Sequence, residues 1–343
     1  MNHRTRVLLA VGVTVVLFLG VQFGALALIE PFHESERQAV ENPDDPTNSV
    51  VYFAIILVAT AFMLVTFKYD VEWLIKALII GVSVMLAWFV FAELVPPVAT
   101  VGSVNAIAAL GAIAVGAGLL FYPEWYVIDS TGVIMGAGAA ALFGISFGLL
   151  PAILLLTVLA VYDAISVYRT EHMLDLAEGV MDLKIPVVLV IPTSLSFSYL
   201  ESGSTDDVLD DDTDSSDDET GSEADSPATE ESDADAETDD QDADAIERDA
   251  LFIGLGDAVI PTILVASAAY FLDVGMIAVP GIALNVPALG AIIGTIAGLL
   301  VLMHMVLKGK PHAGLPLLNG GAISGYLLGA VASGLSLATA LGL

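Results

Sequence analysis

The sequence lacks cysteine altogether and is poor in charge, since only 15% of its 343 residues are Asp, Glu, Lys or Arg. The absence of cysteine excludes disulfide bonds and thiolate metal sites. A soluble domain carries about 25% charged residues, so this composition excludes an ordinary soluble enzyme, a disordered protein and a nucleic-acid binder with a basic face. Hydrophobic residues make up 56% of the chain, a share that indicates a protein of the lipid bilayer.

The acidic residues are concentrated in one segment. Residues 201–249 contain 23 of the 41 Asp and Glu residues and one basic residue, Arg248. The segment buries too little apolar surface to offset the entropy of ordering, so we expect a disordered linker. Its carboxylates lack the spaced glycine and terminal glutamate of a calcium loop, so we expect no metal site there. Such acidity suits a salt-rich cytoplasm and favours the hypothesis of a halophilic host.

Nine apolar segments are candidates to cross the bilayer, which takes about 20 mostly apolar residues. We divide the uncharged run 130–162 at Gly148–Pro151, because Gly and Pro interrupt a helical pattern. The predicted fold is an all-α polytopic membrane protein with nine transmembrane helices. The predicted spans are 7–29, 49–67, 73–95, 98–121, 131–148, 150–168, 250–272, 280–307 and 313–341.

These spans divide the chain into three regions. Residues 1–168 contain the first six helices. Residues 169–249 form a loop with a short amphipathic segment before the acidic run 201–249, and residues 250–343 contain the last three helices. The first span begins after Arg4 and Arg6 as a signal peptide does, but its apolar run exceeds the usual ~7–15 residues, so we expect a retained helix.

The basic residues lie almost entirely on one side. With the N-terminus inside, nine of the ten Lys and Arg residues fall on or near the cytoplasmic side, and only Arg37 falls outside. This asymmetry is the one that orients membrane proteins. The sequence therefore predicts a multi-pass protein of the cell membrane with its N-terminus and acidic loop in the cytoplasm and its C-terminus outside.

Two aspartates lie inside predicted spans, where an ionisable residue is costly and usually functional. Asp163 lies six residues before Arg169, and Asp257 lies about seven residues into the next span. At about 1.5 Å per residue, both sit roughly 9–11 Å below the same surface. Two close carboxyls in a low dielectric share one proton. One can then activate a water while the other protonates the peptide carbonyl and later the leaving amine, without a metal or cofactor.

Other polar residues support weaker interpretations. Asp163 alone is also compatible with a carboxylate that extends toward the interface near Arg169. The histidines are scattered, and none is paired at the spacing of a zinc site. Pro316, in the segment Gly314-Leu315-Pro316-Leu317-Leu318, either lines a cleft at membrane depth or is an ordinary proline in a first helical turn.

Three motifs follow one another in the chain: Tyr162-Asp163, Gly254-Leu255-Gly256-Asp257 after a long loop, and Pro316-x-Leu318 at the start of the last span. In this order they resemble the presenilin and signal-peptide-peptidase family of intramembrane aspartyl proteases. The nine-span layout is similar over the whole chain, and the likeness is most specific from about residue 150 onward. The chain looks like an archaeal homologue.

The resemblance implies that Asp163 and Asp257 are the catalytic pair of an endopeptidase that cleaves within transmembrane helices. It implies a set of substrate-binding residues around them: Tyr162, Gly254, Leu255, Gly256, Pro316, Leu317 and Leu318. The family motif has Ala where this chain has the bulkier Leu317. No metal, cofactor, nucleic acid or obligatory partner subunit is expected, only the lipid bilayer and transmembrane substrates.

The resemblance also concerns substrate entry and orientation. It implies that residues 171–200 lie near the substrate, and the β-prone run 185–191 could pair with an unwound substrate stretch as an added strand. The predicted orientation is similar to that of presenilins, so we expect substrates with an external N-terminus.

Two other functions compete with proteolysis. Transporters also use paired intramembrane acids to relay H⁺ or Na⁺, and they often consist of two related halves. We find no corresponding broken helices in residues 1–150, which makes a transporter the weaker hypothesis. A non-catalytic membrane scaffold is the third. Cleavage of a single-span substrate that requires both aspartates would separate the protease from the other two.

Overall fold

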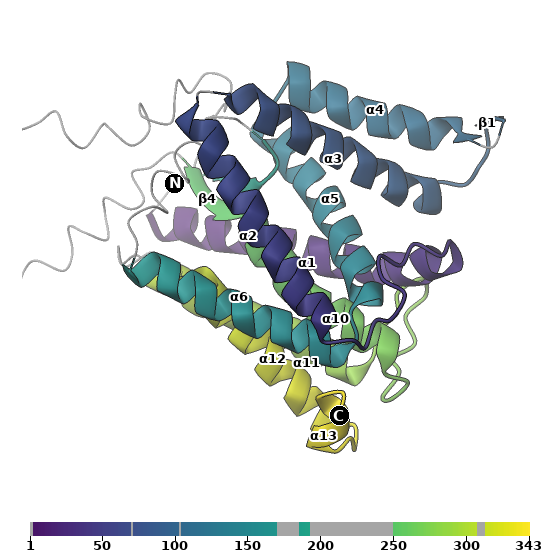
Figure 1. The fold of residues 1–343 in the computed structure, drawn as a ribbon, viewed down its shortest axis with the longest axis vertical. Coiled ribbons are helices and arrows are strands. Elements are labelled where there is room, and N and C mark those ends of the chain that lie inside the picture. Colours follow the sequence, from purple (N-terminus) through teal and green to yellow (C-terminus); the bar gives the residue numbers. More distant parts are fainter. Residues whose placement is uncertain (1–2, 70, 103, 170–184, 193–249, 307–312) are drawn as a thin grey trace, which may run out of the picture.

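The computed structural model describes residues 3–69, 71–102, 104–169, 185–192, 250–306 and 313–343. Most of these residues lie in helices that pack into a bundle (Figure 1). Two short antiparallel ribbons of two strands each complete the described fold. The predicted amphipathic segment and the acidic run 201–249 lie outside the described residues.

The first half of the chain forms six long helices. They are α1 (His3–Glu34), α2 (Thr47–Lys68), α3 (Glu72–Leu94), α4 (Ala106–Phe121), α5 (Trp125–Ser146) and α6 (Leu149–Arg169). The predicted break in the uncharged run is confirmed, because α5 ends and α6 begins around Gly148. Strands β1 (Thr100–Val101) and β2 (Val104–Asn105) form a hairpin before α4, so the span predicted at 98–121 becomes helical only at residue 106. Asn105 caps α4 by accepting hydrogen bonds from the N–H groups of Ile107 and Ala108.

The second half begins with a ribbon and continues with helices. Strand β3 (Val188–Pro192) pairs with β4 (Ala250–Gly254). The helices α10 (Leu255–Phe271), α11 (Val286–Val306), α12 (Gly314–Ala332) and α13 (Leu337–Ala340) follow. The predicted helix over 250–272 is therefore wrong in its first five residues, which form a strand. An apolar run of this length suits a buried strand as well as a helix, and the pairing with β3 decides between them. The fold is mostly helical rather than all-α.

Helix α10 lies at the centre of the bundle, where it packs against α1, α5, α6, α11 and α12. Asn285 fixes the end of α10, because its Nδ2 donates to the carbonyl oxygens of Ala268 and Leu272, both at 2.8 Å. Its Oδ1 accepts the N–H of Ala288 at 2.8 Å and so caps α11. A buried amide with three partners is well satisfied, and it ties α10 to the helix that follows.

Helices α11 and α12 pack backbone against backbone. A Cβ on Gly294 or Gly298 of α11 would run into the carbonyl oxygen of Gly321 or of Leu317, respectively, on α12. Small residues four apart allow such an approach in membrane proteins, where lipid offers little drive for helices to associate. The start of α12 is therefore held in place by α11.

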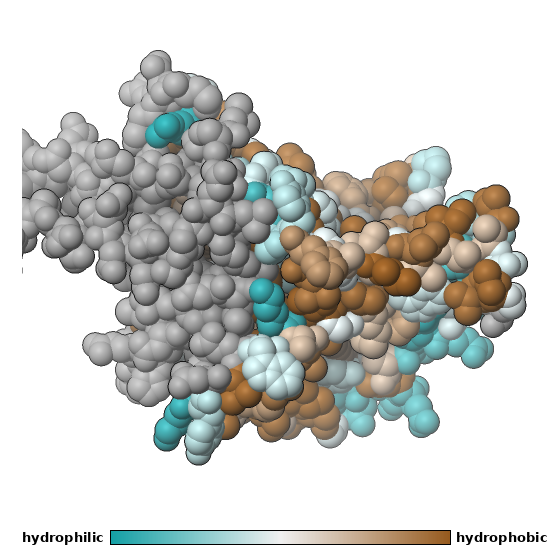
Figure 2. All heavy atoms as spheres, turned by 90° about the horizontal axis from the view of Figure 1, so that it is seen from above, coloured by the Kyte–Doolittle hydropathy of each residue, from teal (hydrophilic) through white to brown (hydrophobic). Residues whose placement is uncertain are grey.

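The outer surface of the bundle is apolar. Large side chains such as Leu8, Val58, Leu110 and Leu328 are 66–73% exposed, and apolar residues predominate on the face that carries α3 and α4 (Figure 2). Soluble monomers rarely expose apolar patches of this extent. In the described part of the chain, seven helices have the length and composition to cross a bilayer. Helices α4 and α10 are apolar but have only 16 and 17 residues. The protein is an integral, multi-pass membrane protein.

Candidate active site

Asp163 lies near the end of α6, with only 9% of its surface exposed. Its Oδ2 accepts a hydrogen bond from the N–H of Leu315, the second residue of α12, at 3.1 Å. The first N–H groups of a helix have no partner within the helix. Asp163, which belongs to α6, supplies such a partner to α12. Its carboxyl therefore acts as an N-terminal cap of α12, a role that is usually filled by a residue of the same chain segment.

Asp257 lies in the first turn of α10, three residues after the end of β4. Because the chain changes from strand to helix at Gly254, Asp257 begins a helix rather than lying two turns into one. A carboxylate near a helix N-terminus interacts favourably with the helix dipole. Pro261, one turn later, has no N–H to donate to the carbonyl of Asp257, so this backbone oxygen lacks its usual helical partner.

The two carboxyl groups meet at the dipeptide Gly314-Leu315. The N–H of Leu315 binds Asp163, and the position that a Cβ on Gly314 would occupy is only 3.2 Å from Oδ2 of Asp257. Both carboxyl groups therefore face the first two residues of α12. Helices α6, α10 and α12 also pack against one another in all three pairs. The structure therefore brings together the two aspartates that the sequence singles out.

The residues of the Pro316-x-Leu318 motif form the first turns of α12. Pro316 is the third residue of the helix, where a missing N–H costs no helical bond. Leu318 is fully buried, whereas Pro316 and Leu317 are half-buried. Asn319, one turn beyond Leu315, donates to the carbonyl oxygen of Leu156 on α6 at 2.9 Å. Two hydrogen bonds thus join the start of α12 to the helix that carries Asp163.

The residues next to the aspartates have different surroundings. Gly254 and Gly256 are exposed beside Asp257. Leu255 is buried, with its side chain against α5 near Gly132 and Gly136. The ring of Tyr162 contacts Phe53 of α2 edge to face, with ring centres 5.9 Å apart.

Sequence reasoning missed two residues at this end of the bundle. The first is Gly314, which packs against Asp257. The sequence pattern indicated Pro316 in the same segment instead. Asp129 of α5 is 4% exposed and accepts the N–H of Val190 in β3 at 2.8 Å. It lies just outside the span predicted at 131–148. An acid within the run Trp125-Tyr126-Val127-Ile128-Asp129 was the signal that could have found it.

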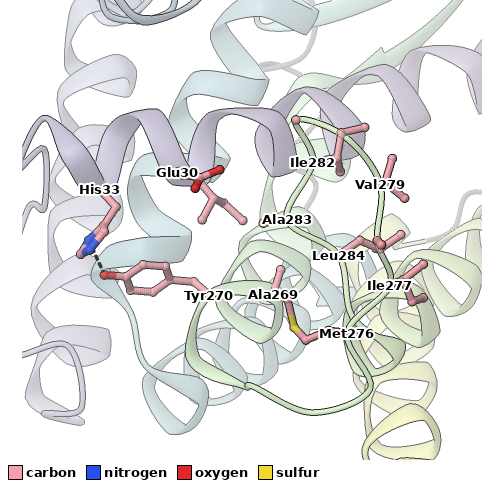
Figure 3. A pocket seen from close by; sticks show the side chains of 13 residues that line it. Glu30, His33, Ala269, Tyr270, Met276, Ile277, Val279, Ile282, Ala283 and Leu284 are labelled. Atoms are coloured by element: carbon pink, nitrogen blue, oxygen red, sulfur yellow. Dashed lines mark hydrogen bonds between the residues drawn. The ribbon is translucent and has the colours of Figure 1, made fainter.

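A separate pocket of about 390 Å³ lies at the opposite end of α10. Figure 3 shows His33 of α1 and Tyr270 of α10 pointing toward each other, and His33 Nδ1 lies 2.7 Å from the tyrosine oxygen. Tyr270 lies thirteen positions after Asp257 on α10, roughly 20 Å along the helix. This pocket is therefore distinct from the paired carboxyls. Among the described residues, no cluster of three or more His, Asp or Glu side chains could hold a metal ion.

The family model for signal-peptide peptidase and presenilin aspartyl proteases matches residues 15–335. The chain belongs to this family. It is an intramembrane aspartyl protease. A solved structure of a presenilin family intramembrane aspartate protease in space group C222 is 30% identical, with a TM-score of 0.60 over 94% of this chain and 99% of that one.

A second structure of a presenilin family protease, in space group P2, is 31% identical. Its TM-score is 0.57 over 93% of this chain and 96% of that one. A search of the curated proteins found no match. The likeness to both solved structures covers nearly the whole chain, so the bundle as a whole is the fold of this protease family.

The contact between Gly314 and Asp257 allows a test of the geometry of this protease. A Cβ at residue 314 would stand 3.2 Å from Oδ2 of Asp257, so the carboxyl must move. We expect Gly314→Val to lower kcat/KM by about tenfold or more, since a displacement near 1 Å can cost up to a hundredfold. Cleavage of a single-span substrate in detergent measures this.

The matched control is Gly320→Val on the same helix, because nothing lies within 4 Å of a Cβ there. It should retain the wild-type rate. A folded Gly314→Val protein that cleaves as fast as the Gly320→Val protein would contradict the close contact.

Proposed function

We propose that Asp163 and Asp257 are the catalytic pair with which this protease hydrolyses peptide bonds in transmembrane substrates. The observation that carries the proposal is that both carboxyls contact Gly314-Leu315 from two different helices. Each is half-buried or buried in an apolar bundle. Buried acids are costly in an apolar bundle, and this chain places two of them against the same dipeptide.

The chemistry needs one proton between the two carboxyls. The ionised carboxylate removes a proton from a water molecule, and the water oxygen attacks the carbonyl carbon of the scissile peptide bond. The protonated carboxyl gives its proton to the carbonyl oxygen, which forms a gem-diol. As the C–N bond breaks, a proton passes to the leaving nitrogen, and the products are a carboxylic acid and an amine. The pair then again holds one proton.

A helical substrate hides its carbonyl groups in helical hydrogen bonds, so it must unwind near the pair. We propose that the extended stretch lies along the ribbon of β3 and β4, because β4 ends three residues before Asp257. This keeps the expectation that the run 185–191 lies near the substrate. The run is not a single free strand, since β3 already pairs with β4 along one edge. The expectation that the run itself pairs with the substrate is not kept, because Asp129 takes the N–H of Val190 on the other edge.

The residues that border the pair divide into two groups. We propose that the exposed Gly254 and Gly256 and the half-buried Pro316 and Leu317 contact the substrate backbone. A further group supports them from behind, and its members are Tyr162, Leu255 and Leu318. Leu255 and Leu318 are in this group because they are at most 4% exposed. The half-buried Tyr162 joins them because its ring packs against Phe53 of α2.

We further propose that the protein needs no partner subunit and comes from a halophilic archaeon, for which the acidity of residues 201–249 is the support. Cleavage by the purified chain tests the first point. Retention of the rate in molar KCl tests the second.

The central test replaces each aspartate in the purified full-length protein. We expect Asp163→Ala and Asp257→Ala each to abolish cleavage of a single-span substrate in liposomes, because either change removes the acid or the base. Mass spectrometry of the products measures the loss. Asp273→Ala, which changes an exposed acid just after α10, is the matched control and should cleave normally.

Substantial activity in either catalytic variant would overturn the assignment. A transition-state mimic of aspartyl proteases should bind the wild type and block it. Binding of the mimic without any cleavage by the wild type would contradict the proposed substrate class.

We propose nine crossings, with the N-terminus and residues 169–249 in the cytoplasm and the C-terminus outside. Two features support an odd number of membrane crossings. Lys and Arg are biased to one side, and the N- and C-terminal ends lie toward opposite ends of the bundle in Figure 1. Although α10 is short, β4 extends the same segment by five residues. Substrates would then enter with their N-termini outside.

Reporter fusions to the C-terminus test the orientation. We expect a reporter that is active only outside the cytoplasm to be active there, and one that needs the cytoplasm to be inactive. The reverse pattern would exclude nine crossings with an internal N-terminus.

A further inference from the structure

Asp129 is a buried acid that the proposed chemistry does not use. It lies in α5, is 4% exposed, and its Oδ1 accepts the N–H of Val190 at 2.8 Å. Burying a carboxyl to accept a backbone hydrogen bond is expensive compared with burying an apolar side chain. Its presence therefore calls for a role that an apolar residue would not fill, and the geometry of β3 indicates what that role is.

The ribbon has a defined pairing edge. The N–H of Leu255 donates to the carbonyl oxygen of Val187 at 2.7 Å, and the register sets Leu189 opposite Ile253. Backbone groups alternate between the two edges along a strand. The odd-numbered residues of β3 therefore direct their N–H and C=O groups toward β4.

The even-numbered residues of β3 direct theirs to the opposite edge. These are Val188, Val190 and Pro192. Pro192 has no N–H, and Asp129 takes the N–H of Val190. A proline and an inward-pointing charge are the devices by which proteins block a sheet edge against a further strand. This edge of β3 is therefore closed, and a substrate cannot pair along it.

Helix α5 also forms a surface against which the ribbon packs. Asp129, Gly132 and Gly136 lie on one face of the helix, at the i, i+3 and i+7 spacing. A Cβ on Gly132 would lie 3.1 Å from Cδ2 of Leu189, and one on Gly136 would lie 3.2 Å from Cδ1 of Leu255. The glycines thus admit side chains from β3 and from the start of α10. Asp129 adds one directional bond to this contact.

We propose that Asp129 is a positioning residue that anchors the β3–β4 ribbon on α5, and that it thereby fixes which substrate bond lies at the carboxyl pair. The path is short. Val190 lies opposite Phe252 in β4, and Asp257 follows five residues later. A shift of the ribbon on α5 moves the start of α10 and any extended substrate beside it. This inference rests on the proposed function, because it concerns the position of the same two carboxyls.

The test compares three substitutions of Asp129 in the full-length protein. Asp129→Asn keeps an oxygen that can accept the N–H of Val190. Asp129→Ala removes the acceptor, and Asp129→Glu keeps the charge but moves it by one methylene. The readouts are kcat, KM and the positions of cleavage in a single-span substrate, determined by mass spectrometry, together with the melting temperature in detergent.

We expect Asp129→Ala to lower kcat about tenfold or more and to move the main cleavage site or spread it over neighbouring bonds. Asp129→Glu should also change the distribution of sites. Asp129→Asn should cleave the wild-type bond, with kcat reduced by no more than about threefold. If the Ala variant does not fold, the Glu variant decides, because it retains a carboxyl at the buried position.

Ser146→Ala is the matched control. Ser146 lies at the other end of α5, and its Oγ also accepts a backbone N–H, that of Ala39, at 2.8 Å. It is fully buried. Its loss should lower the melting temperature without moving the cleavage site.

A folded Asp129→Ala or Asp129→Glu protein that cuts the wild-type bond at the wild-type kcat would overturn the inference. So would an Asn variant as impaired as the Ala variant, since that would assign the effect to charge. Failure of the proposed function looks different: the wild type would not cleave, or Asp257→Ala would remain active.

Discussion

The site depends on the hydrogen bond between the N–H of Leu315 and the carboxyl of Asp163. In an apolar bundle a buried acid needs a polar partner, and the start of a helix needs acceptors for its first N–H groups. One contact meets both needs. It also brings the first residues of α12 between the two acids, where Gly314 leaves room for Asp257. The same contact therefore stabilises the bundle and assembles the pair.

The neighbouring elements fit around this contact. Two glycine-lined approaches bring α11 against α12, and two hydrogen bonds join the first turns of α12 to α6. On the other side, the change from β4 to α10 at Gly254 sets Asp257 in a first helical turn. Asp257 lies in this turn beside the exposed Gly254 and Gly256. A reaction that consumes water needs such a position, whereas an acid in the middle of a continuous helix would be cut off from it.

Much of this site could be predicted from the sequence, because the cost of an ionisable group in lipid singles out Asp163 and Asp257 without any structure. The spans could be predicted as well, because a segment that crosses the bilayer must be apolar over about 20 residues. The start of α10 could not be predicted, because the five apolar residues Ala250 to Gly254 suit a strand or a helix equally. Their pairing with β3, about sixty residues earlier in the chain, decides in favour of a strand. Asp129 escaped notice because its role depends on a strand distant in sequence. The exposures of Leu255 and Tyr162 likewise follow from packing against α5 and α2, which no local pattern reveals.

The measurement that bears most directly on the shared proton is the pH dependence of kcat/KM for the purified protease with a single-span substrate. Two carboxyls that hold one proton between them are inactive when both are protonated, because no base remains, and inactive when both are ionised, because no acid remains. The profile should therefore be bell-shaped: kcat/KM falls at low pH because the base is lost, and it falls at high pH because the acid is lost. A rate that rises to a plateau and stays there at high pH would contradict a two-carboxyl mechanism, because a single base would then suffice.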